Sequence, residues 1–206
     1  MMPQLPTVSV VDDDRQVRES LAALIQSMDL EVHCYATGQQ FLANYTPTRP
    51  GCVVLDLRLP QLNGLQVLDE MAARRLKVPV IMISGHGDIT AAVSAMKAGA
   101  VDFLEKPYRG SALLESVRRA IDIDVRQRRA QADYDRLRGR FESLTPQEQE
   151  VLRLTMAGKT DKAIALKLDL SLRTVQLRRA SIMRKVNVRS RTELICLVQE
   201  AVHPLR

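Results

Sequence analysis

The sequence predicts an α/β module over residues 1–124, a helical linker over 125–142 and a small all-α module over 143–206. In the first half, short apolar runs alternate with segments of helical period, which is typical of a parallel sheet with helices on both faces. The net charge is −3 over residues 1–124, with 12 Lys and Arg against 15 Asp and Glu, and +9 over residues 125–206, with 18 against 9. A basic second module indicates a polyanionic partner.

Five strand–helix units are expected in the first module. The strands are short apolar runs at Thr7–Val11, Glu31–Tyr35, Cys52–Leu57, Val80–Ser84 and Val101–Glu105. The helices between them carry apolar residues three and four positions apart, at Arg15–Ser27, Gly38–Tyr45, Asn63–Arg75 and Ile89–Ala98. A fifth helix begins near Ser111.

The linker contains the charged stretch RQRRAQADYDRLRGR, which has one glycine and no proline. We expect an exposed helix here, with a break near Gly139, because glycine weakens a helix interior. Four short helices follow, at Gln147–Ala157, Lys162–Leu168, Arg173–Val186 and Thr192–Val202. The first of these has a typical start, in which Thr145 caps the helix, Pro146 takes the first helical position and Glu148 closes a capping box.

Composition excludes several classes of protein. No apolar run approaches the roughly 20 residues that a membrane span needs. MMPQLPTVSVV has no basic region before an apolar one, so we expect no secretory signal and a cytoplasmic location. The cysteines Cys34, Cys52 and Cys196 lie far apart in apolar runs, which predicts buried side chains and neither a zinc site nor a disulfide framework.

Polar side chains stand where the predicted strands end. Asp12, Asp13 and Asp14 follow the first strand, Asp56 ends the third, Ser84 ends the fourth and Lys106 follows the fifth. Ligands of such sheets bind beyond the carboxyl ends of the strands, so these groups converge on one edge. A pocket shared by Asp12, Asp13 and Asp56 brings like charges together and favours a hard divalent cation, Mg²⁺.

A carboxylate beside Mg²⁺, with an ammonium and a hydroxyl nearby, can attack phosphorus and form an aspartyl phosphate. Lys106 would then pair with phosphate oxygens, and Ser84 would donate a hydrogen bond to one of them. Taken singly, the three aspartates could be a helix cap, the serine structural and Lys106-Pro107 a turn. Their order and their common place at strand ends favour the phosphate site.

The motifs VVDDDR, VVLDLRLP, IMISGHGD and FLEKPY resemble the receiver domain of two-component response regulators, and GHGD with MKAGAVDFLEKP is similar to the FixJ subgroup. The resemblance implies a flavodoxin-like sheet of order 2-1-3-4-5 and phosphorylation of Asp56 by a sensor histidine kinase. It also assigns roles to the other site residues. Mg²⁺ is held by Asp12, Asp13, Asp56 and the backbone carbonyl of Arg58; Ser84 and Lys106 contact the phosphoryl group, and Phe103 is the aromatic switch residue.

Three short helices with a polar turn before the third match a helix-turn-helix arrangement. In the supporting helix, Lys162–Leu168, the residues Ala163, Ile164 and Leu168 are expected to face the core. Ser171 is expected to cap the next helix, Arg173–Val186. The outward face of that next helix is basic, which suits a phosphate backbone. The alternative is an ordinary solvated helix in a small bundle.

LTPQEQEVL, GKTDKAIALKL and SLRTVQLRRASIMRKVNVRSRTEL resemble the LuxR-type DNA-binding domain. The resemblance implies that base edges are contacted by Gln176, Leu177 and Ala180. Phosphates are implied near Arg173, Thr174, Arg178, Arg179, Arg184 and Lys185. The chain departs from the pattern at Asp161, where Asn is frequent and which can still cap the helix, and at Arg178, where His is frequent.

Together these motifs predict a transcription factor that is phosphorylated on Asp56, forms homodimers and binds double-stranded promoter DNA. One alternative is a phosphatase that passes through an aspartyl phosphate, with Asp12 as nucleophile and Asp14 as acid. Another is a DNA-binding protein whose first module is purely structural and is not phosphorylated.

Overall fold

The structure of the chain is a computed structural model that describes residues 5–85 and 89–202. It divides into two compact units, Met1–Arg128 and Arg129–Arg206. Residues 86–88 of the GHGD motif lie outside the described residues. No helix in the described part of the chain is long and apolar enough to cross a membrane.

The first unit is built on a parallel sheet of order β2-β1-β3-β4-β5, as predicted. Its strands are β1 (Thr7–Val11), β2 (Glu31–Tyr35), β3 (Gly51–Asp56), β4 (Val80–Ser84) and β5 (Asp102–Glu105). Its helices are α1 (Arg15–Gln26), α2 (Gly38–Asn44), α3 (Gly64–Ala73), α4 (Ile89–Lys97) and α5 (Gly110–Glu142), which runs on into the second unit. The strand and helix bounds agree with the predicted ranges within two residues.

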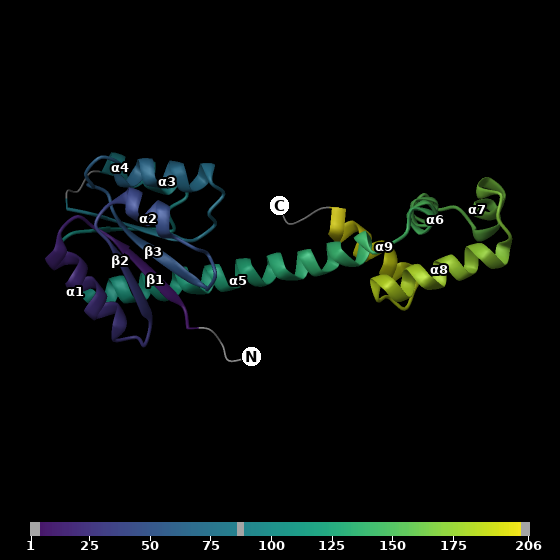
Figure 1. The fold of residues 1–206 in the computed structure, drawn as a ribbon, viewed down its shortest axis with the longest axis horizontal. Coiled ribbons are helices and arrows are strands. Elements are labelled where there is room, and N and C mark those ends of the chain that lie inside the picture. Colours follow the sequence, from purple (N-terminus) through teal and green to yellow (C-terminus); the bar gives the residue numbers. More distant parts are fainter. Residues whose placement is uncertain (1–4, 86–88, 203–206) are drawn as a thin grey trace. The chain divides into compact units, whose positions relative to one another are not determined.

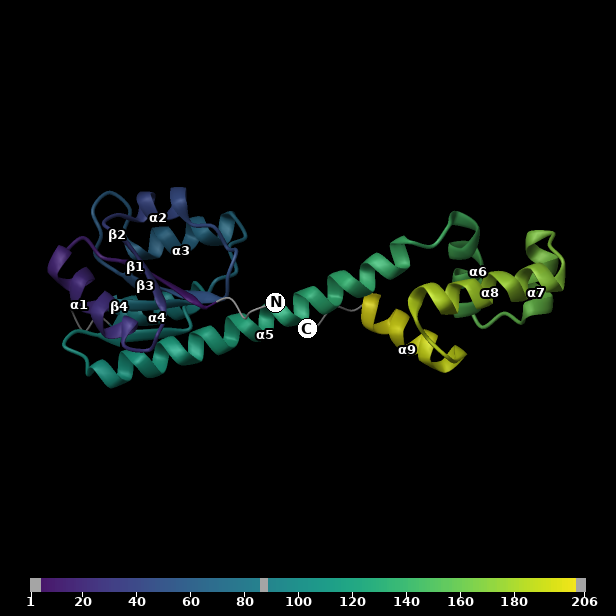
Figure 2. The same ribbon diagram turned by 60° about the horizontal axis from the view of Figure 1, so that its bottom comes forward.

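Helices cover both faces of this sheet (Figures 1 and 2). On one face, α1 and the first part of α5 bury a cluster that includes Val8, Val10, Leu21, Ile25, Leu113 and Val117. On the other face, α2, α3 and α4 bury a cluster that includes Val11, Phe41, Leu55, Val67, Met71 and Ala95. Successive residues of a strand point to opposite faces, and both faces of β3 are covered. All six residues of β3 are therefore buried.

The start of α3 approaches the end of β3 closely. Asn63 and Gln66 form a reciprocal capping box at the helix start, which fixes where α3 begins. A Cβ atom at Gly64 would lie 2.6 Å from the backbone oxygen of Asp56. Glycine at this position lets the helix pack directly against the strand end that presents Asp56.

The second unit is helical. It consists of the end of α5 with α6 (Pro146–Met156), α7 (Asp161–Leu168), α8 (Leu172–Val186) and α9 (Arg191–Val202). The capping box of Thr145 and Glu148, with Pro146 in the first turn, is present as predicted. Ser171 caps α8, as predicted. The helices enclose a separate core that includes Val151, Leu154, Ile164, Val175, Ile182 and Leu194.

Several local predictions are wrong. The helix does not break at Gly139, since α5 continues to Glu142. Ala163 is exposed and Ala165 is buried in its place, next to Ile164, which is buried as predicted. Cys34 and Cys196 are exposed, and only Cys52 is buried as expected. Cys34 lies on the edge strand β2 and Cys196 on the last helix, α9. An apolar run in the sequence does not show which face of such an element is buried and which is exposed to solvent.

Candidate functional site

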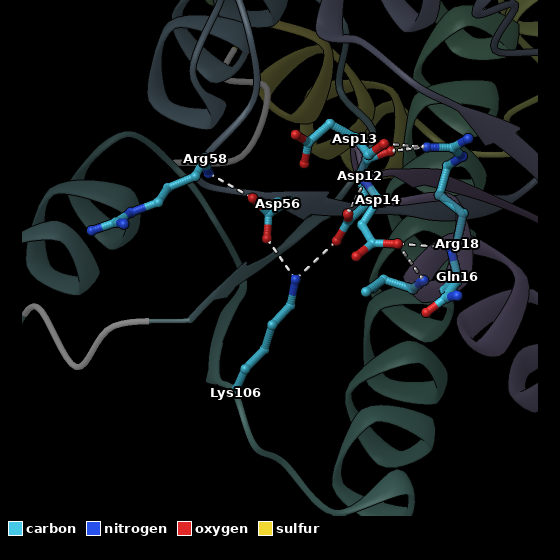
Figure 3. A network of polar contacts seen from close by, with 9 residues as sticks. Asp12, Asp13, Asp14, Gln16, Arg18, Asp56, Arg58 and Lys106 are labelled. Atoms are coloured by element: carbon cyan, nitrogen blue, oxygen red, sulfur yellow. Dashed lines mark hydrogen bonds and ion pairs between the residues drawn. The ribbon is translucent and has the colours of Figure 1, made fainter.

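Lys106 joins two of the predicted acidic residues at the carboxyl edge of the sheet. Its Nζ atom donates to Asp12 Oδ2 at 2.9 Å and to Asp56 Oδ1 at 2.8 Å (Figure 3). Both carboxylates are buried, with 2% of Asp12 and 7% of Asp56 exposed. Asp56, at the end of the buried strand β3, is therefore compensated by an ammonium that follows the edge strand β5, two strands away.

The second oxygen of Asp56 is also bound. Asp56 Oδ2 accepts a hydrogen bond of 2.7 Å from the backbone N–H of Arg58. Burial raises the pKa of Asp56, and the hydrogen bonds and charge of Lys106 oppose this rise. Burial lowers the pKa of Lys106, but the hydrogen bonds and charges of Asp56 and Asp12 outweigh it, so this pKa is raised. The lysine is thus held as an ammonium facing the two carboxylates.

The three consecutive aspartates have different surroundings. Asp12 is buried and accepts from the backbone N–H of Asp14 at 2.9 Å. Asp13 is exposed. Asp14 caps α1 by accepting from the backbone N–H groups of Gln16 and Val17 at 2.7 and 3.3 Å. Arg18 then donates to the backbone oxygens of Asp12 and Asp13 at 2.7 and 2.9 Å, which fixes the turn that presents them (Figure 3).

The oxygen donors of this edge are of the kind that Mg²⁺ prefers, since that ion takes one or two carboxylates and keeps several waters. Asp12 and Asp56 already share one cationic partner, Lys106. Asp13 does not join them, and within residues 5–85 and 89–202 no group of three or more His, Cys, Asp or Glu is placed to hold a metal. The donor set fits Mg²⁺ if the side chain of Asp13 turns inward.

Ser84 lies on β4, the strand next to that of Asp56, and Phe103 lies on β5, one strand further out. Ser84 ends β4 and is buried, with 1% exposed. The backbone oxygen of Ser84 accepts from the N–H of Lys106 at 2.7 Å, so the two residues are held next to each other. Phe103 on β5 is half-buried and packs against the cluster under α3 and α4.

In the second unit, α8 presents a continuous exposed face. Five of the nine residues that sequence resemblance assigned to DNA are exposed and recur at helical spacing, namely Arg173, Gln176, Leu177, Ala180 and Arg184. The large apolar side chain of Leu177 is 64% exposed. Opposite this face, α8 buries Val175, Ile182 and Val186 in the core. An amphipathic helix with this outward face can enter a DNA groove.

The four remaining residues of that set lie beside the exposed face and have partners within the unit. Thr174 Oγ1 lies 2.8 Å from Ser171 Oγ. Arg178 donates to Gln147 Oε1 at 2.8 Å, and Arg179 forms an ion pair of 2.6 Å with Asp161. Lys185 Nζ donates to Glu148 Oε2. The sequence pattern did not separate these flanking residues from the exposed face.

Glu148 connects the start of α6 to the end of α8. Its carboxylate accepts from Lys185 Nζ at 2.7 Å, from Ser181 Oγ at 2.7 Å and from the backbone N–H of Thr145 at 2.8 Å. The hydrogen bond from Lys185 is the largest of the effects that lower the pKa of Glu148 to about 2. The network holds α8 at a defined position on α6.

Asp161 does not cap α7, contrary to the prediction. Thr160 is the cap, and its hydroxyl accepts from the backbone N–H of Ala163 at 3.3 Å. Asp161 is the first residue of the helix, so its carboxylate is free of the capping role and reaches Arg179 on α8. Sequence reasoning missed this ion pair, because the two residues are 18 positions apart.

Comparison with protein families agrees with both units. Residues 8–118 match the response regulator receiver domain, and residues 142–198 match the LuxR family of bacterial regulatory proteins. The chain is similar to the response regulator protein TmoT of Ectopseudomonas mendocina, with 37% identity over 100% of this chain and 94% of that protein. It is also similar to the transcriptional regulatory protein FixJ of Rhizobium meliloti, with 38% identity over 92% of this chain and 93% of that protein.

Among solved structures, the response regulator StyR matches with a TM-score of 0.88 and 41% identity, over 95% of this chain and 99% of that one. Full-length FixJ from B. japonicum matches with a TM-score of 0.59 and 36% identity, over 98% of each chain. The similarity therefore extends over both units and the helix α5 that runs through them.

Proposed function

The chain belongs to the two-component response regulators that combine a receiver domain with a LuxR-type DNA-binding domain, and we propose that phosphorylation of Asp56 controls its binding to DNA. It is a transcription regulator and not an enzyme, which sets the phosphatase alternative aside. We assign residues 1–124 to the receiver, 125–142 to the linker and 143–206 to the DNA-binding domain.

The convergence of Asp12 and Asp56 on Lys106 Nζ carries the proposal. An Asp56 carboxylate oxygen attacks the phosphorus of the donor, a phosphohistidine of a sensor kinase, and the bond from phosphorus to the imidazole nitrogen breaks. Lys106 then moves its ammonium from the free carboxylate to the phosphate oxygens, where the negative charge now lies. The hydroxyl of Ser84 donates to one of those oxygens.

Mg²⁺ would be held by Asp12, Asp13, Asp56 and the backbone carbonyl of Arg58. When bound, it would neutralise charge on the phosphoryl oxygens as the transfer proceeds. Lys106 alone offers one positive charge to two carboxylates, so a dianionic phosphoryl group needs a further cation at this edge.

Labelling with acetyl phosphate tests this assignment. The protein with Mg²⁺ should take up one phosphoryl group, and Asp56→Asn should take up none, because an amide is not a nucleophile here. Chelation with EDTA should prevent labelling of the wild type. Labelling that persists in Asp56→Asn, or without a divalent ion, contradicts the assignment. Complete failure of the wild type to label would favour the purely structural receiver.

DNA is proposed to meet the exposed face of α8. Gln176, Leu177 and Ala180 would reach base edges, with Arg173 and Arg184 at phosphates on either side. The flanking residues Thr174, Arg178, Arg179 and Lys185 would approach the DNA backbone once they leave or share their partners in the unit. Gln can pair bidentately with adenine, and Leu and Ala can contact a thymine methyl group.

Phosphorylation is proposed to act through dimerisation. The phosphoryl group on Asp56 would draw Ser84 towards it and let Phe103 turn inward, which changes the surface of α4 and β5. A homodimer of receivers raises the effective concentration of two DNA-binding domains at a paired site.

Ultracentrifugation with and without acetyl phosphate tests this mechanism. The dimer fraction and the affinity for a two-half-site duplex should rise together, while the affinity for a single half-site stays nearly constant. If the half-site affinity rises equally while the protein remains monomeric, phosphorylation would instead act by releasing a blocked α8, the helix proposed to contact DNA.

A further inference from the structure

The recognition helix α8 carries five cationic side chains, and the structure separates them by partner. Arg178, Arg179 and Lys185 each bind an acceptor on another segment of the second unit. Arg173 and Arg184 are exposed, and no hydrogen bond or ion pair from either side chain is found in the described part of the chain. Only these two cations are directly available to a phosphate.

The pair of Arg179 and Asp161 differs from the other two. Glu148, the partner of Lys185, is buried and bound by Ser181 and Thr145 as well. Gln147, the partner of Arg178, is uncharged. Asp161 is a carboxylate whose only recorded side-chain partner among the described residues is Arg179, at 2.6 Å. Both side chains keep solvent access, with 26% of Arg179 and 23% of Asp161 exposed.

The position of Asp161 at the start of α7 also matters for an approaching phosphate. It is the first residue of α7, and the N-terminus of a helix attracts anions, phosphate included. A carboxylate fixed there occupies that positive end and repels an approaching phosphate. The same carboxylate neutralises the guanidinium of Arg179 on the neighbouring helix.

We propose that Asp161 competes with the DNA backbone for Arg179 and thereby lowers the affinity of this DNA-binding domain for DNA of any sequence. Arg179 reaches a phosphate only by leaving Asp161, so the gain from that contact is reduced by the ion pair that is lost. A weak single domain makes binding depend more strongly on two domains acting together. The inference rests on the proposed DNA interface of α8.

The test is Asp161→Asn in the full-length chain, with a short duplex of random sequence as the probe. Asparagine keeps the size of the side chain, and the Thr160 cap is untouched. Affinity should rise about threefold to eightfold at about 0.1 M salt, the lower figure from the loss of a partly exposed ion pair and the upper from one added phosphate contact. The plot of log affinity against log salt should steepen by up to about 0.9 per chain.

Asp169→Asn is the matched control. Asp169 ends α7 in the left-handed conformation, with φ 53°, which asparagine tolerates. The substitution makes the same charge change in the same helix-turn-helix, and no ion pair to Asp169 is found in the described residues. Its gain in affinity should be clearly smaller than that of Asp161→Asn.

A double-mutant cycle with Arg179→Gln completes the test. In the Arg179→Gln background, Asp161→Asn should give no more than the gain of the control. The proposal is overturned by a full gain in that background, by an equal gain from Asp169→Asn, or by unchanged or weaker binding of Asp161→Asn. If the wild type itself fails to bind the duplex in a salt-dependent way, the DNA interface of α8 is wrong, which is a separate result.

Discussion

The carboxylate of Asp124 on α5 accepts a hydrogen bond of 2.8 Å from the backbone N–H of Gly51, the first residue of β3 and 73 positions earlier in the chain. Asp124 is 2% exposed and also binds Arg128 at 2.7 Å. Arg128 in turn donates to the backbone oxygen of Pro47 at 2.9 Å. A buried acid thus ties α5 to the segment that leads into the strand of Asp56.

Asp124→Ala should destabilise the first unit. The substitution leaves the N–H of Gly51 buried without an acceptor, which costs about 1–3 kcal/mol. Urea unfolding followed by circular dichroism should show a lower midpoint for this unit. Asp122→Asn on the exposed side of the same helix is the control and should change the midpoint little. An unchanged midpoint for Asp124→Ala would mean that water replaces the carboxylate without cost.

Asp12 and Asp13 should differ in what their loss does to the apo protein. Asp13 is exposed, whereas Asp12 is bound to Lys106. Asp12→Asn should therefore change the free energy of unfolding of the metal-free protein, and Asp13→Asn should not. Both substitutions should weaken Mg²⁺ binding by about tenfold or more, since losing even an outer partner of a metal ligand costs about 10–100-fold. Calorimetric titration with Mg²⁺ checks this. Wild-type affinity in Asp13→Asn would remove Asp13 from the metal site.

Gln176 and Arg184 should have different effects on DNA recognition. Arg184→Ala should weaken binding to all sequences alike and flatten the salt plot by about 0.9 per chain. Gln176→Ala should change the preferred sequence, because a good bidentate pair discriminates by about 1–3 kcal/mol. Affinities at several salt concentrations measure the effect of Arg184→Ala, and selection from a random library of duplexes measures that of Gln176→Ala. If the Gln176→Ala protein selects the same sites as the wild type, Gln176 does not read a base.

Stability of the second unit should depend on acid pH through Glu148. Its folded pKa is about 2 against an ordinary 4.5, so the unfolded chain binds the proton first as pH falls. The stabilising contribution is therefore complete above about pH 5 and is lost as pH falls towards about 2. Urea unfolding of Glu148→Gln should show lower stability near neutral pH and a flatter dependence below it.

Glu142→Gln is the control for this pH series, since Glu142 is an exposed acid whose partner Arg138 lies on the same helix. It should keep the wild-type profile. A Glu148→Gln variant that retains the full loss of stability between about pH 5 and about pH 2 would assign the effect to other carboxylates.

The sheet order, the helix bounds and the meeting of Asp56 with Lys106 were predictable from the sequence. The helix bounds follow from apolar periodicity, the sheet order follows from the resemblance to receiver domains, and the meeting of Asp56 with Lys106 follows because all parallel strands end at one edge. Asp124 was not predictable, since an acid in an apolar stripe gives no sign of the N–H that it will meet. The same holds for the pair of Asp161 and Arg179. Periodicity describes which face of an element is covered, but it does not identify partners on other elements.

The continuity of α5 through Gly139 has a consequence for local unfolding of this helix. Nearly all residues between Arg129 and Gly139 are exposed, so their amide hydrogens are protected by the helix's own hydrogen bonds alone. Isolated helices of about this length are marginal in water, and a glycine weakens them further. Amide exchange in this stretch should therefore be much faster than in Leu113–Ile121, which packs on the sheet. Trypsin, which cuts after the arginines that are frequent here, would release two fragments that each retain a hydrophobic core.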